Sequence, residues 1–286
     1  IIEMGSRRTH EQAAVTAARA AYLAGFESTS NLEAAARYGI PASGTAAHSW
    51  TLAHVNDDGS ANEKAAFKSQ IEAHGVKTTL LVDTFDITQG VNNAIEVAGV
   101  ELGGVRIDSG NLGAITRRVR KQLDDLGAHN TKIVVSSDLD EFAIAGLRGD
   151  PVDVYGVGTS VVTGSGAPTA SMVYKIVEVD GHPVAKRSEA KKSVGGAKRA
   201  LRSYRSSGVA IEEIIFPFDS EEPDTGHLSS KMLTVPLIRD GEIVDKQPSL
   251  DESREYLAHS IKTLPWEGLA LTRDEPAVHT RYVGFE

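Results

Sequence analysis

Residues that can do chemistry follow six short apolar segments in the first 160 residues of the chain. Each segment is rich in Val, Ile, Leu or Thr, whereas the residues directly after it are charged, hydroxylic or glycine. If the segments are parallel strands, their carboxyl ends form one ligand-binding edge. We therefore predict a site that combines cations, carboxylates, an imidazole and a glycine-rich turn: Arg7, Arg8 and Arg106; Asp83, Asp86, Asp108 and Asp138; His48; and Gly156–Ser160.

His48 has the widest chemical range of these residues. Imidazole can act as an acid, a base or a nucleophile near neutral pH. A lone histidine is more often structural, but His48 follows an apolar segment among small side chains, with Thr45 and Ser49 nearby. We therefore predict a catalytic role for His48.

The carboxylates after the third, fourth and fifth segments favour a metal or a sugar as ligand. Asp83, Asp108 and Asp138 could coordinate Mg²⁺ or accept hydrogen bonds from sugar hydroxyls. The alternative is that an aspartate only caps the next helix. Asp138 is the first candidate for that role, because a predicted helix begins at Asp140.

The arginines and the glycine-rich turn favour an anionic ligand. Arg7, Arg8 and Arg106 offer guanidinium groups that bind phosphate or carboxylate. In the turn, Gly156 and Gly158 would allow backbone N–H groups to approach a phosphate, and Thr159 and Ser160 would add hydroxyl donors. The turn alone is weak evidence, since glycine after a strand is common.

Strands and helices alternate up to about residue 180, which predicts parallel strands joined by right-handed crossovers. This pattern fits either an α/β barrel or an open doubly wound sheet. The predicted strands are Ile1–Met4, Ile40–Thr45, Thr78–Thr84, Leu102–Ile107, Lys132–Ser136, Val152–Val157 and Met172–Val179.

The sequence changes character after residue 180. Turn pairs at Asp180–Gly181 and Asp240–Gly241 predict two hairpins, and residues 186–205 are strongly basic. We predict an α/β domain over residues 1–180 that carries the site, and a C-terminal appendage over residues 181–286 that wraps it.

Composition excludes several classes of protein. The 286 residues carry 30 Lys and Arg against 39 Asp and Glu, a net charge of −9, which argues against a nucleic-acid partner. The chain has no cysteine, so disulfides, thiolate metal sites and cysteine nucleophiles are excluded. No apolar run reaches membrane-spanning length and no signal peptide is evident, so we expect no membrane association and a cytoplasmic location.

Several of these motifs, in this order, resemble nicotinate phosphoribosyltransferases. The resemblance spans about residues 1–180 and implies an irregular, partly open α/β barrel of the type II phosphoribosyltransferase kind. The motifs that carry it are Arg7–Arg8, Gly25–Asn31, Gly39–Pro41, Gly44–Ser49, Leu80–Asp86, Arg106–Gly110 and Gly156–Thr163.

The resemblance implies a reaction. Nicotinate would attack C1 of phosphoribosyl pyrophosphate to give nicotinate mononucleotide and pyrophosphate, with Mg²⁺ as cofactor and ATP hydrolysis coupled to the step. The family's phosphorylated histidine falls on His48. In this reaction the leaving group needs cations and the oxocarbenium-like ribose needs nearby carboxylates.

The resemblance also assigns individual residues. Arg106 and Thr45 match positions that hold nicotinate, and Arg7 matches one that meets pyrophosphate in the related nicotinamide enzyme. Thr159, with the backbone of Gly156 and Gly158, matches the 5′-phosphate site. Ser30 stands where the nicotinamide enzyme has an aspartate, which would repel a carboxylate, so nicotinate is the expected substrate; as an N-cap, Ser30 would fit either substrate.

Two departures from the family qualify this assignment. Met4 stands where relatives carry an aromatic residue that stacks on the pyridine ring. The family's N-terminal region, which contributes a tyrosine to the nicotinate site, is missing from this sequence, and we expect a homodimer in which another copy completes the site.

Three alternatives stay open. A quinolinate or nicotinamide phosphoribosyltransferase would share the fold, although His48 and Ser30 argue against both. A lyase would need a Schiff-base lysine, and these strand ends carry none. A non-catalytic fragment that binds nucleotides is the third.

Overall fold

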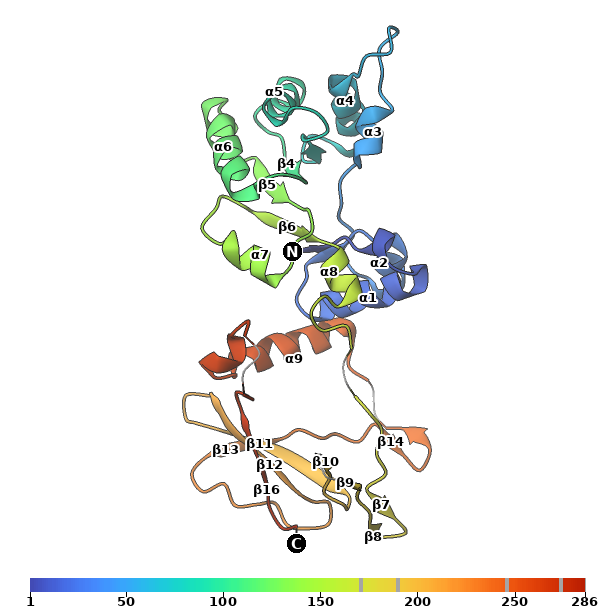
Figure 1. Ribbon diagram of the computed structural model, residues 1–286, viewed down its shortest axis with the longest axis vertical. Helices are drawn as coiled ribbons and strands as arrows, with labels where there is room; N and C mark the ends of the chain where they lie inside the picture. Colours follow the sequence, from blue (N-terminus) through green and yellow to red (C-terminus); the bar gives the residue numbers. More distant parts are fainter. Residues whose placement is uncertain (170–171, 189–190, 245–246, 273–274, 286) are drawn as a thin grey trace. The chain divides into compact units, whose positions relative to one another are not determined.

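The computed structural model describes residues 1–169, 172–188, 191–244, 247–272 and 275–285 (Figure 1). It divides the chain into two compact units, Ile1–Pro168 and Thr169–Glu286. The boundary predicted after residue 180 therefore falls inside the second unit. That the second part wraps the first stays a prediction.

The first unit is built on a curled sheet of six parallel strands in the order β2-β1-β6-β5-β4-β3. Strands that follow one another in the chain are neighbours in the sheet, except that β2 and β3 are not paired and leave the barrel open between them. Strand β1 pairs with β6. This arrangement is the partly open α/β barrel expected from the sequence. The strands are β1 (Ile2–Glu3), β2 (Ser28–Thr29), β3 (Thr79–Leu81), β4 (Gly104–Ile107), β5 (Lys132–Val135) and β6 (Val154–Val157).

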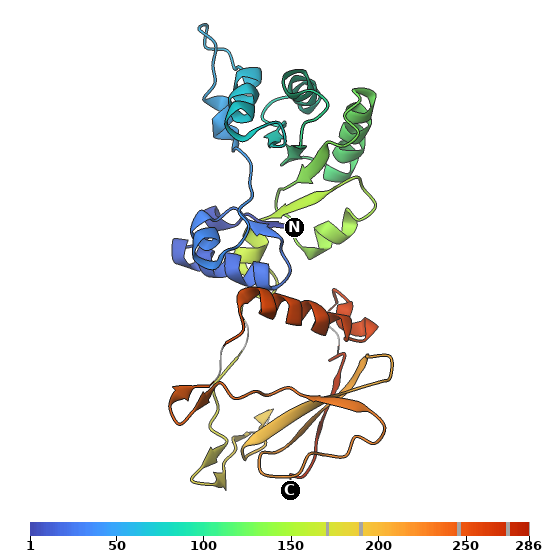
Figure 2. The ribbon, with the colours of Figure 1, turned by 180° about the vertical axis from the view of Figure 1, so that it is seen from behind.

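Helices connect these strands, and Figure 2 shows α1 and α2 beside one end of the sheet and α4 to α6 beside the other. They are α1 (Glu11–Leu23), α2 (Leu32–Tyr38), α3 (His48–Leu52), α4 (Glu63–His74), α5 (Ile87–Ala98), α6 (Leu112–Asp125), α7 (Glu141–Gly146) and α8 (Thr159–Thr163), with a 3₁₀ turn, η1, at Ser6–Arg8. Six of them begin at a side chain that accepts a backbone N–H of the first turn, which satisfies an otherwise orphaned donor. Those caps are His10, Asn31, Asn62, Asp86, Asn111 and Asp140.

The core lies between the strands and helices α4 to α6. Val105, Ile107, Ile133 and Val135 are fully buried. Because both faces of these strands are covered, their sequences are mostly apolar. The exception in β4 is Arg106, which is buried one residue before the end of the strand.

Five of the seven predicted strands are confirmed, as β1 and β3 to β6. The prediction of a strand at Ile40–Thr45 is wrong, because Pro41 and Gly44 interrupt the segment and only Ala42 forms a bridge, to Thr29. The prediction of a barrel strand at Met172–Val179 is also wrong: Glu178–Val179 is β7 of a hairpin instead.

The second unit is a small antiparallel-rich domain. Its four-stranded sheet has the order β13-β11-β12-β16 and a small core of Leu201, Ile214 and Phe216. Both predicted hairpins are confirmed, as β7 with β8 and β14 with β15. The elements are β7 (Glu178–Val179), β8 (His182–Pro183), β9 (Arg187–Ser188), β10 (Lys191–Lys192), β11 (Lys198–Tyr204), β12 (Ala210–Pro217), β13 (Ser229–Met232), β14 (Ile238–Arg239), β15 (Glu242–Ile243), α9 (Leu250–Lys262), η2 (Trp266–Leu269) and β16 (His279–Tyr282).

Candidate functional site

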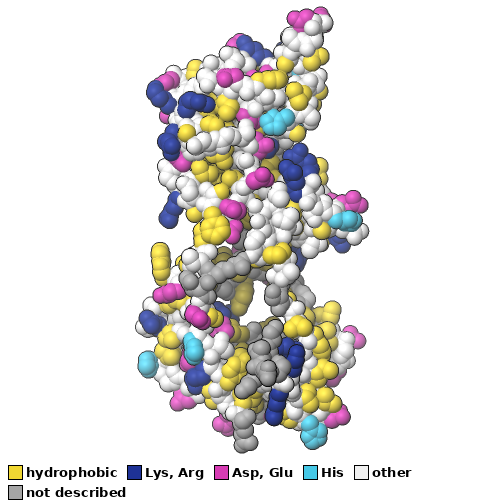
Figure 3. Space-filling view, in the orientation of Figure 1, with side chains coloured by type: hydrophobic (Ala, Val, Ile, Leu, Met, Phe, Trp, Pro, Cys, Tyr) yellow, Lys and Arg dark blue, Asp and Glu magenta, His cyan; other side chains and the backbone are white. Residues whose placement is uncertain are grey.

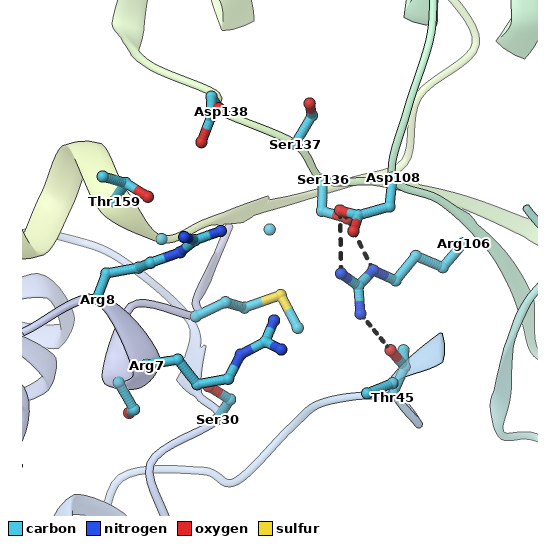
Figure 4. A pocket seen from close by; sticks show the side chains of 15 residues that line it. Arg7, Arg8, Ser30, Thr45, Arg106, Asp108, Ser136, Ser137, Asp138 and Thr159 are labelled. Carbon is cyan, nitrogen blue, oxygen red and sulfur yellow. Dashed lines mark hydrogen bonds and ion pairs between the residues drawn. The ribbon is translucent and has the colours of Figure 1, made fainter. Parts of the chain in front are cut away.

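A pocket of about 470 Å³ lies at the carboxyl ends of the barrel strands. Figure 4 shows the side chains of Arg7 and Arg8, from η1, and of Arg106, from β4, entering the pocket. The pocket therefore brings together groups that lie about a hundred residues apart in the chain. Its lining is Met4, Ser6, Arg7, Arg8, Ser30, Thr45, Ala47, Arg106, Asp108, Ser136, Ser137, Asp138, Gly156, Gly158 and Thr159.

Arg106, in β4, is fixed by three hydrogen bonds and is only 7% exposed. Its Nε donates to Ser136 Oγ at 2.7 Å, and its Nη1 donates to Thr45 Oγ1 at 2.7 Å. Its Nη2 donates to Asp108 Oδ1 at 3.1 Å. A guanidinium has five N–H groups, so two remain for a ligand in a fixed plane. The arrangement suits a planar carboxylate.

Asp108 and Asp83 form the acidic side of this network. Burial acts to raise the pKa of Asp108, but hydrogen bonds from Ser136 and Arg106 and the charges of Arg106 and His48 outweigh it and hold the pKa below its usual range. Asp83 is buried, and its Oδ2 accepts hydrogen bonds from the Asp108 backbone N–H at 2.7 Å and from Ser109 Oγ at 2.9 Å. Asp83 therefore positions Asp108 rather than lining the pocket.

His48 lies beside these two carboxylates, at the start of α3. Its Nε2 is 3.8 Å from Asp83 Oδ1 and 3.7 Å from Asp108 Oδ2. Its Nδ1 is 3.1 Å from Thr84 Oγ1. Two carboxylates near Nε2 favour the proton on that nitrogen. Nδ1 then carries the lone pair and accepts the Thr84 hydroxyl hydrogen.

Arg7 and Arg8 supply uncompensated positive charge. No ion pair of either side chain is found among the described residues. Basic side chains also gather over α6 (Figure 3). Three of the basic side chains of α6 form ion pairs, Arg117 with Asp150, Arg120 with Asp124 and Lys121 with Asp125. Arg7 and Arg8 instead keep their charge available to an anion in the pocket.

The glycines after β6 allow close packing at the pocket floor. A Cβ at Gly156 would lie 2.5 Å from Met4 Sδ, and one at Gly158 would lie 3.0 Å from the Met4 carbonyl oxygen. Met4 thus covers Gly156 and lines the pocket. Glycine is needed here for the approach of β1 to β6.

Most residues predicted for the site do line this pocket, namely Arg7, Ser30, Thr45, Arg106, Asp108, Asp138, Gly156, Gly158 and Thr159. His48, Asp83 and Ser160 do not line it, although His48 and Asp83 contact Asp108 or its backbone. The alternative of Asp138 as a helix cap is wrong, because Asp140 caps α7. Ser30 as a cap is wrong too, because Asn31 caps α2.

Sequence reasoning missed residues that act through others. Ser136 anchors Arg106, and Thr84 contacts His48. Each of them is the last residue of a predicted strand, and a hydroxyl group at a strand end is the signal that could have identified them.

Ser137 is the strained residue of the site. Its φ is 127°, a region that L-residues rarely adopt, and its carbonyl accepts the Leu139 N–H at 2.8 Å. Strain of this kind costs on the order of 1–3 kcal/mol and is typical of functional sites. The turn presents Asp138 to the pocket.

Replacing Ser137 with glycine should therefore stabilise the protein by about 1 kcal/mol, since glycine adopts this φ freely. Urea unfolding of S137G and the parent protein measures the difference. Ser165→Gly, at a residue without positive φ, is the control and should be neutral or destabilising. A lower free energy of unfolding for S137G than for the parent would contradict the strain argument.

Among the described residues, no helix is both long and apolar enough to cross a membrane. In the same part of the chain, no group of three or more His, Cys, Asp or Glu side chains is arranged to hold a metal ion.

Comparison with known sequences finds one family along the barrel. The profile of the nicotinate phosphoribosyltransferase (NAPRTase) family matches residues 1–207. The chain is 57% identical over 285 residues to nicotinate phosphoribosyltransferase pncB1 of Mycobacterium tuberculosis, covering 99% of this chain and 63% of that protein. It is 30% identical over 340 residues to human nicotinate phosphoribosyltransferase, covering 92% of this chain and 63% of that one. The chain thus spans less than two thirds of the length of these relatives.

Two solved structures of enzymes that act on nicotinate or its nucleotide are also similar to this chain. The crystal structure of nicotinate-nucleotide pyrophosphorylase from Pyrococcus furiosus matches with a TM-score of 0.78 and 29% identity, covering 92% of this chain and 65% of that one. The human nicotinic acid phosphoribosyltransferase structure matches with a TM-score of 0.73 and 26% identity, covering 99% and 68%. Both structures share the fold described above.

Proposed function

Because this chain belongs to the nicotinate phosphoribosyltransferase family, we propose that it transfers phosphoribose from phosphoribosyl pyrophosphate to nicotinate, with ATP hydrolysis coupled to the transfer. The products are nicotinate mononucleotide and pyrophosphate, which places the enzyme in NAD biosynthesis. The observation that carries this proposal is the pocket itself. It combines a buried, fixed guanidinium for a carboxylate with two exposed, unpaired arginines for phosphates.

The proposed binding mode follows the charges of the substrates. The nicotinate carboxylate binds the two remaining N–H groups of Arg106 beside Thr45. Pyrophosphate lies against Arg7 and Arg8, and the 5′-phosphate lies against Thr159 and the adjacent glycines. The carboxylate, the pyrophosphate and the 5′-phosphate thus bind different residues of the same pocket.

The proposed transfer makes one bond and breaks one. The lone pair of the pyridine nitrogen forms the bond to C1 of ribose, and the electrons of the C1–oxygen bond leave with pyrophosphate. Positive charge develops on the ribose as that bond lengthens, and carboxylates such as Asp108 and Asp138 stabilise it. Arg7 and Arg8 stabilise the charge on the leaving group.

A magnesium ion fits the donors that are present. Mg²⁺ is commonly held by one or two carboxylates together with waters and substrate phosphates, and Asp138 and Asp108 line the pocket as such carboxylates. When bound there, Mg²⁺ would neutralise charge on the pyrophosphate. Arg7 and Arg8 would hold the remaining phosphate oxygens in orientation.

His48 is proposed as the phosphoryl acceptor from ATP. With the proton held on Nε2 between Asp83 and Asp108, Nδ1 gives up its hydrogen bond with Thr84 and its lone pair forms a bond to the γ-phosphorus. The bond between that phosphorus and the β–γ bridging oxygen breaks, and ADP leaves with its electrons. Hydrolysis of phosphohistidine later returns the imidazole and releases phosphate. Since His48 contacts Asp108, its phosphorylation changes the charge next to the Arg106 network.

The acceptor test separates this proposal from its alternatives. The complete protein, including any segment beyond these 286 residues, is supplied with phosphoribosyl pyrophosphate, Mg²⁺, ATP and an equimolar mixture of nicotinate, nicotinamide and quinolinate. Each acceptor carries a different isotopic label in its ring, because quinolinate that loses its C2 carboxylate as CO₂ also gives nicotinate mononucleotide. We expect the mononucleotide of nicotinate as the main product. A main product from either competitor would replace the proposal with that enzyme, and nucleotide binding without any product would favour a non-catalytic protein.

Ser30 is proposed to select the acid over the amide, and Ser30→Asp should lower the nicotinate-to-nicotinamide ratio of kcat/KM by at least about tenfold. An aspartate in this pocket would repel the nicotinate carboxylate and accept from the amide nitrogen. Steady-state kinetics with each acceptor gives the ratio. Ser30→Ala is the control and should keep the preference for the acid; an unchanged ratio in S30D would remove Ser30 from the selection.

The homodimer with a shared site and the cytoplasmic location stay predictions. We propose that the tyrosine contact to nicotinate comes from a second copy of the protein, and that Met4, which lines the pocket, covers one face of the pyridine ring.

A further inference from the structure

Glu3 is a buried carboxylate that the proposed reaction does not use. It lies in β1, between β2 and β6, and is 1% exposed. No ion pair of its side chain is found in the described part of the chain. A carboxylate without a cationic partner is costly to bury, so its hydrogen bonds must compensate.

Those hydrogen bonds join the two turns that follow β1 and β2. Glu3 Oε1 accepts the Gly5 N–H at 2.5 Å, at the start of the turn that carries Arg7 and Arg8. Glu3 Oε2 accepts the Thr29 hydroxyl at 2.5 Å, directly before Ser30. The Glu3 carboxylate therefore binds both Gly5, at the start of one turn, and Thr29, directly before the other.

Further contacts close these bonds into a ring. Thr29 Oγ1 accepts the Asn31 N–H at 3.0 Å, and Asn31 Nδ2 donates to Ser6 Oγ at 3.0 Å. Ser6 follows Gly5, so the ring returns to the turn where it began. The turn is also packed tightly, since a Cβ at Gly5 would lie 2.9 Å from the Gly158 carbonyl oxygen.

We propose that Glu3 is a positioning residue. It fixes the turn that carries Arg7 and Arg8, which bind pyrophosphate, relative to the turn that carries Ser30, which selects the acid. This inference rests on the proposed function for the identity of the ligands. Glu3 touches neither substrate; it acts through Gly5 and Thr29 on Arg7, Arg8 and Ser30. Charge-assisted hydrogen bonds of this kind are the strong ones, and their geometry is specific.

Two substitutions break the ring in a defined way. In Glu3→Gln the amide oxygen can still accept from Gly5, but the NH₂ group replaces the acceptor of the Thr29 hydroxyl. Thr29→Val removes the hydroxyl while keeping the shape of the side chain. Thr29→Ser keeps the hydroxyl and should restore the parent behaviour.

The test measures KM and kcat for both substrates, and the Kd of inorganic pyrophosphate by calorimetry, in the complete protein. For E3Q and T29V we expect KM for phosphoribosyl pyrophosphate and nicotinate, and the Kd of pyrophosphate, to rise about tenfold. We expect kcat to change by less than about threefold. T29S should stay within about twofold of the parent in all three quantities.

Thr131→Val is the matched control. Thr131 is as buried as Thr29, and its hydroxyl donates to the Leu102 carbonyl at 3.1 Å. It lies directly before β5, at the opposite end of the strand from the pocket. T131V should lower the melting temperature without changing KM. If T29V behaves like T131V, with lower stability but KM and Kd within about twofold of the parent, the positioning role is refuted, whether or not E3Q folds.

The two proposals fail in different ways. If the parent protein forms no nicotinate mononucleotide, the proposed function fails, and the pyrophosphate Kd still decides the role of Glu3. If the parent is active and binds pyrophosphate but T29V and every folded E3Q sample match it, only the role of Glu3 fails.

Discussion

Replacing Arg106 with alanine is expected to lower kcat/KM for nicotinate by about 10²–10³-fold. The guanidinium is nearly buried and bonded to Ser136, Thr45 and Asp108, so its loss removes the carboxylate site and leaves Asp108 without its cation. Truncating one partner of a buried, hydrogen-bonded charge pair at a binding site costs about 2–5 kcal/mol of binding free energy, and each 1.4 kcal/mol corresponds to a factor of ten. Steady-state kinetics with varied nicotinate measures the effect.

Arg106→Lys is the matched variant for this prediction. Lysine keeps the charge but loses the planar fork that reaches three partners at once. We expect an intermediate loss, mostly in KM. Activity of R106A within about fivefold of the parent, in protein that folds normally, would show that nicotinate binds elsewhere.

Replacing His48 with alanine is expected to abolish ATP coupling. Without the imidazole, no phosphoryl group can be held beside Asp83 and Asp108. The protein should no longer be labelled by γ-³²P ATP, and ATP should no longer accelerate formation of the mononucleotide. Acid-labile labelling and the rate ratio with and without ATP are the two measurements.

His54→Ala provides the comparison. His54 lies just after α3, and its Nδ1 contacts the Trp50 carbonyl at 2.8 Å, without any contact to the aspartates of the site. H54A should be labelled and stimulated like the parent protein. Unchanged labelling of H48A would place the phosphoryl acceptor on another residue.

The strand ends were the part of the site that could be predicted from the sequence. Buried parallel strands are mostly apolar, so Arg106, Asp108 and Asp138 stand out near the points where apolar segments stop. Parallel pairing brings those points to one edge. These two facts predict this part of the pocket lining without any knowledge of side-chain contacts.

What could not be predicted depends on contacts across the sheet. Strand β2 is two residues long, and Ser28 and Thr29 carry no strand pattern of their own; their pairing with β1 makes them a strand. Glu3 looked like an ordinary charged residue in a short strand. Its role is visible only because Thr29, 26 residues away in the chain, donates to it.

The residue that caps α2 could not be predicted from the sequence either. Ser30 and Asn31 are both good N-caps by type, and sequence alone favoured the serine. The structure uses Asn31, whose side chain also reaches Ser6. The Ser30 side chain is thereby left to line the pocket.

The most direct measurement follows labelled nicotinate in the complete protein with phosphoribosyl pyrophosphate, Mg²⁺ and ATP. We expect nicotinate mononucleotide and pyrophosphate to form in equal amounts, and neither to form when phosphoribosyl pyrophosphate is omitted. A folded, complete protein that leaves the label in nicotinate under these conditions would contradict the assignment of this pocket as a nicotinate phosphoribosyltransferase site.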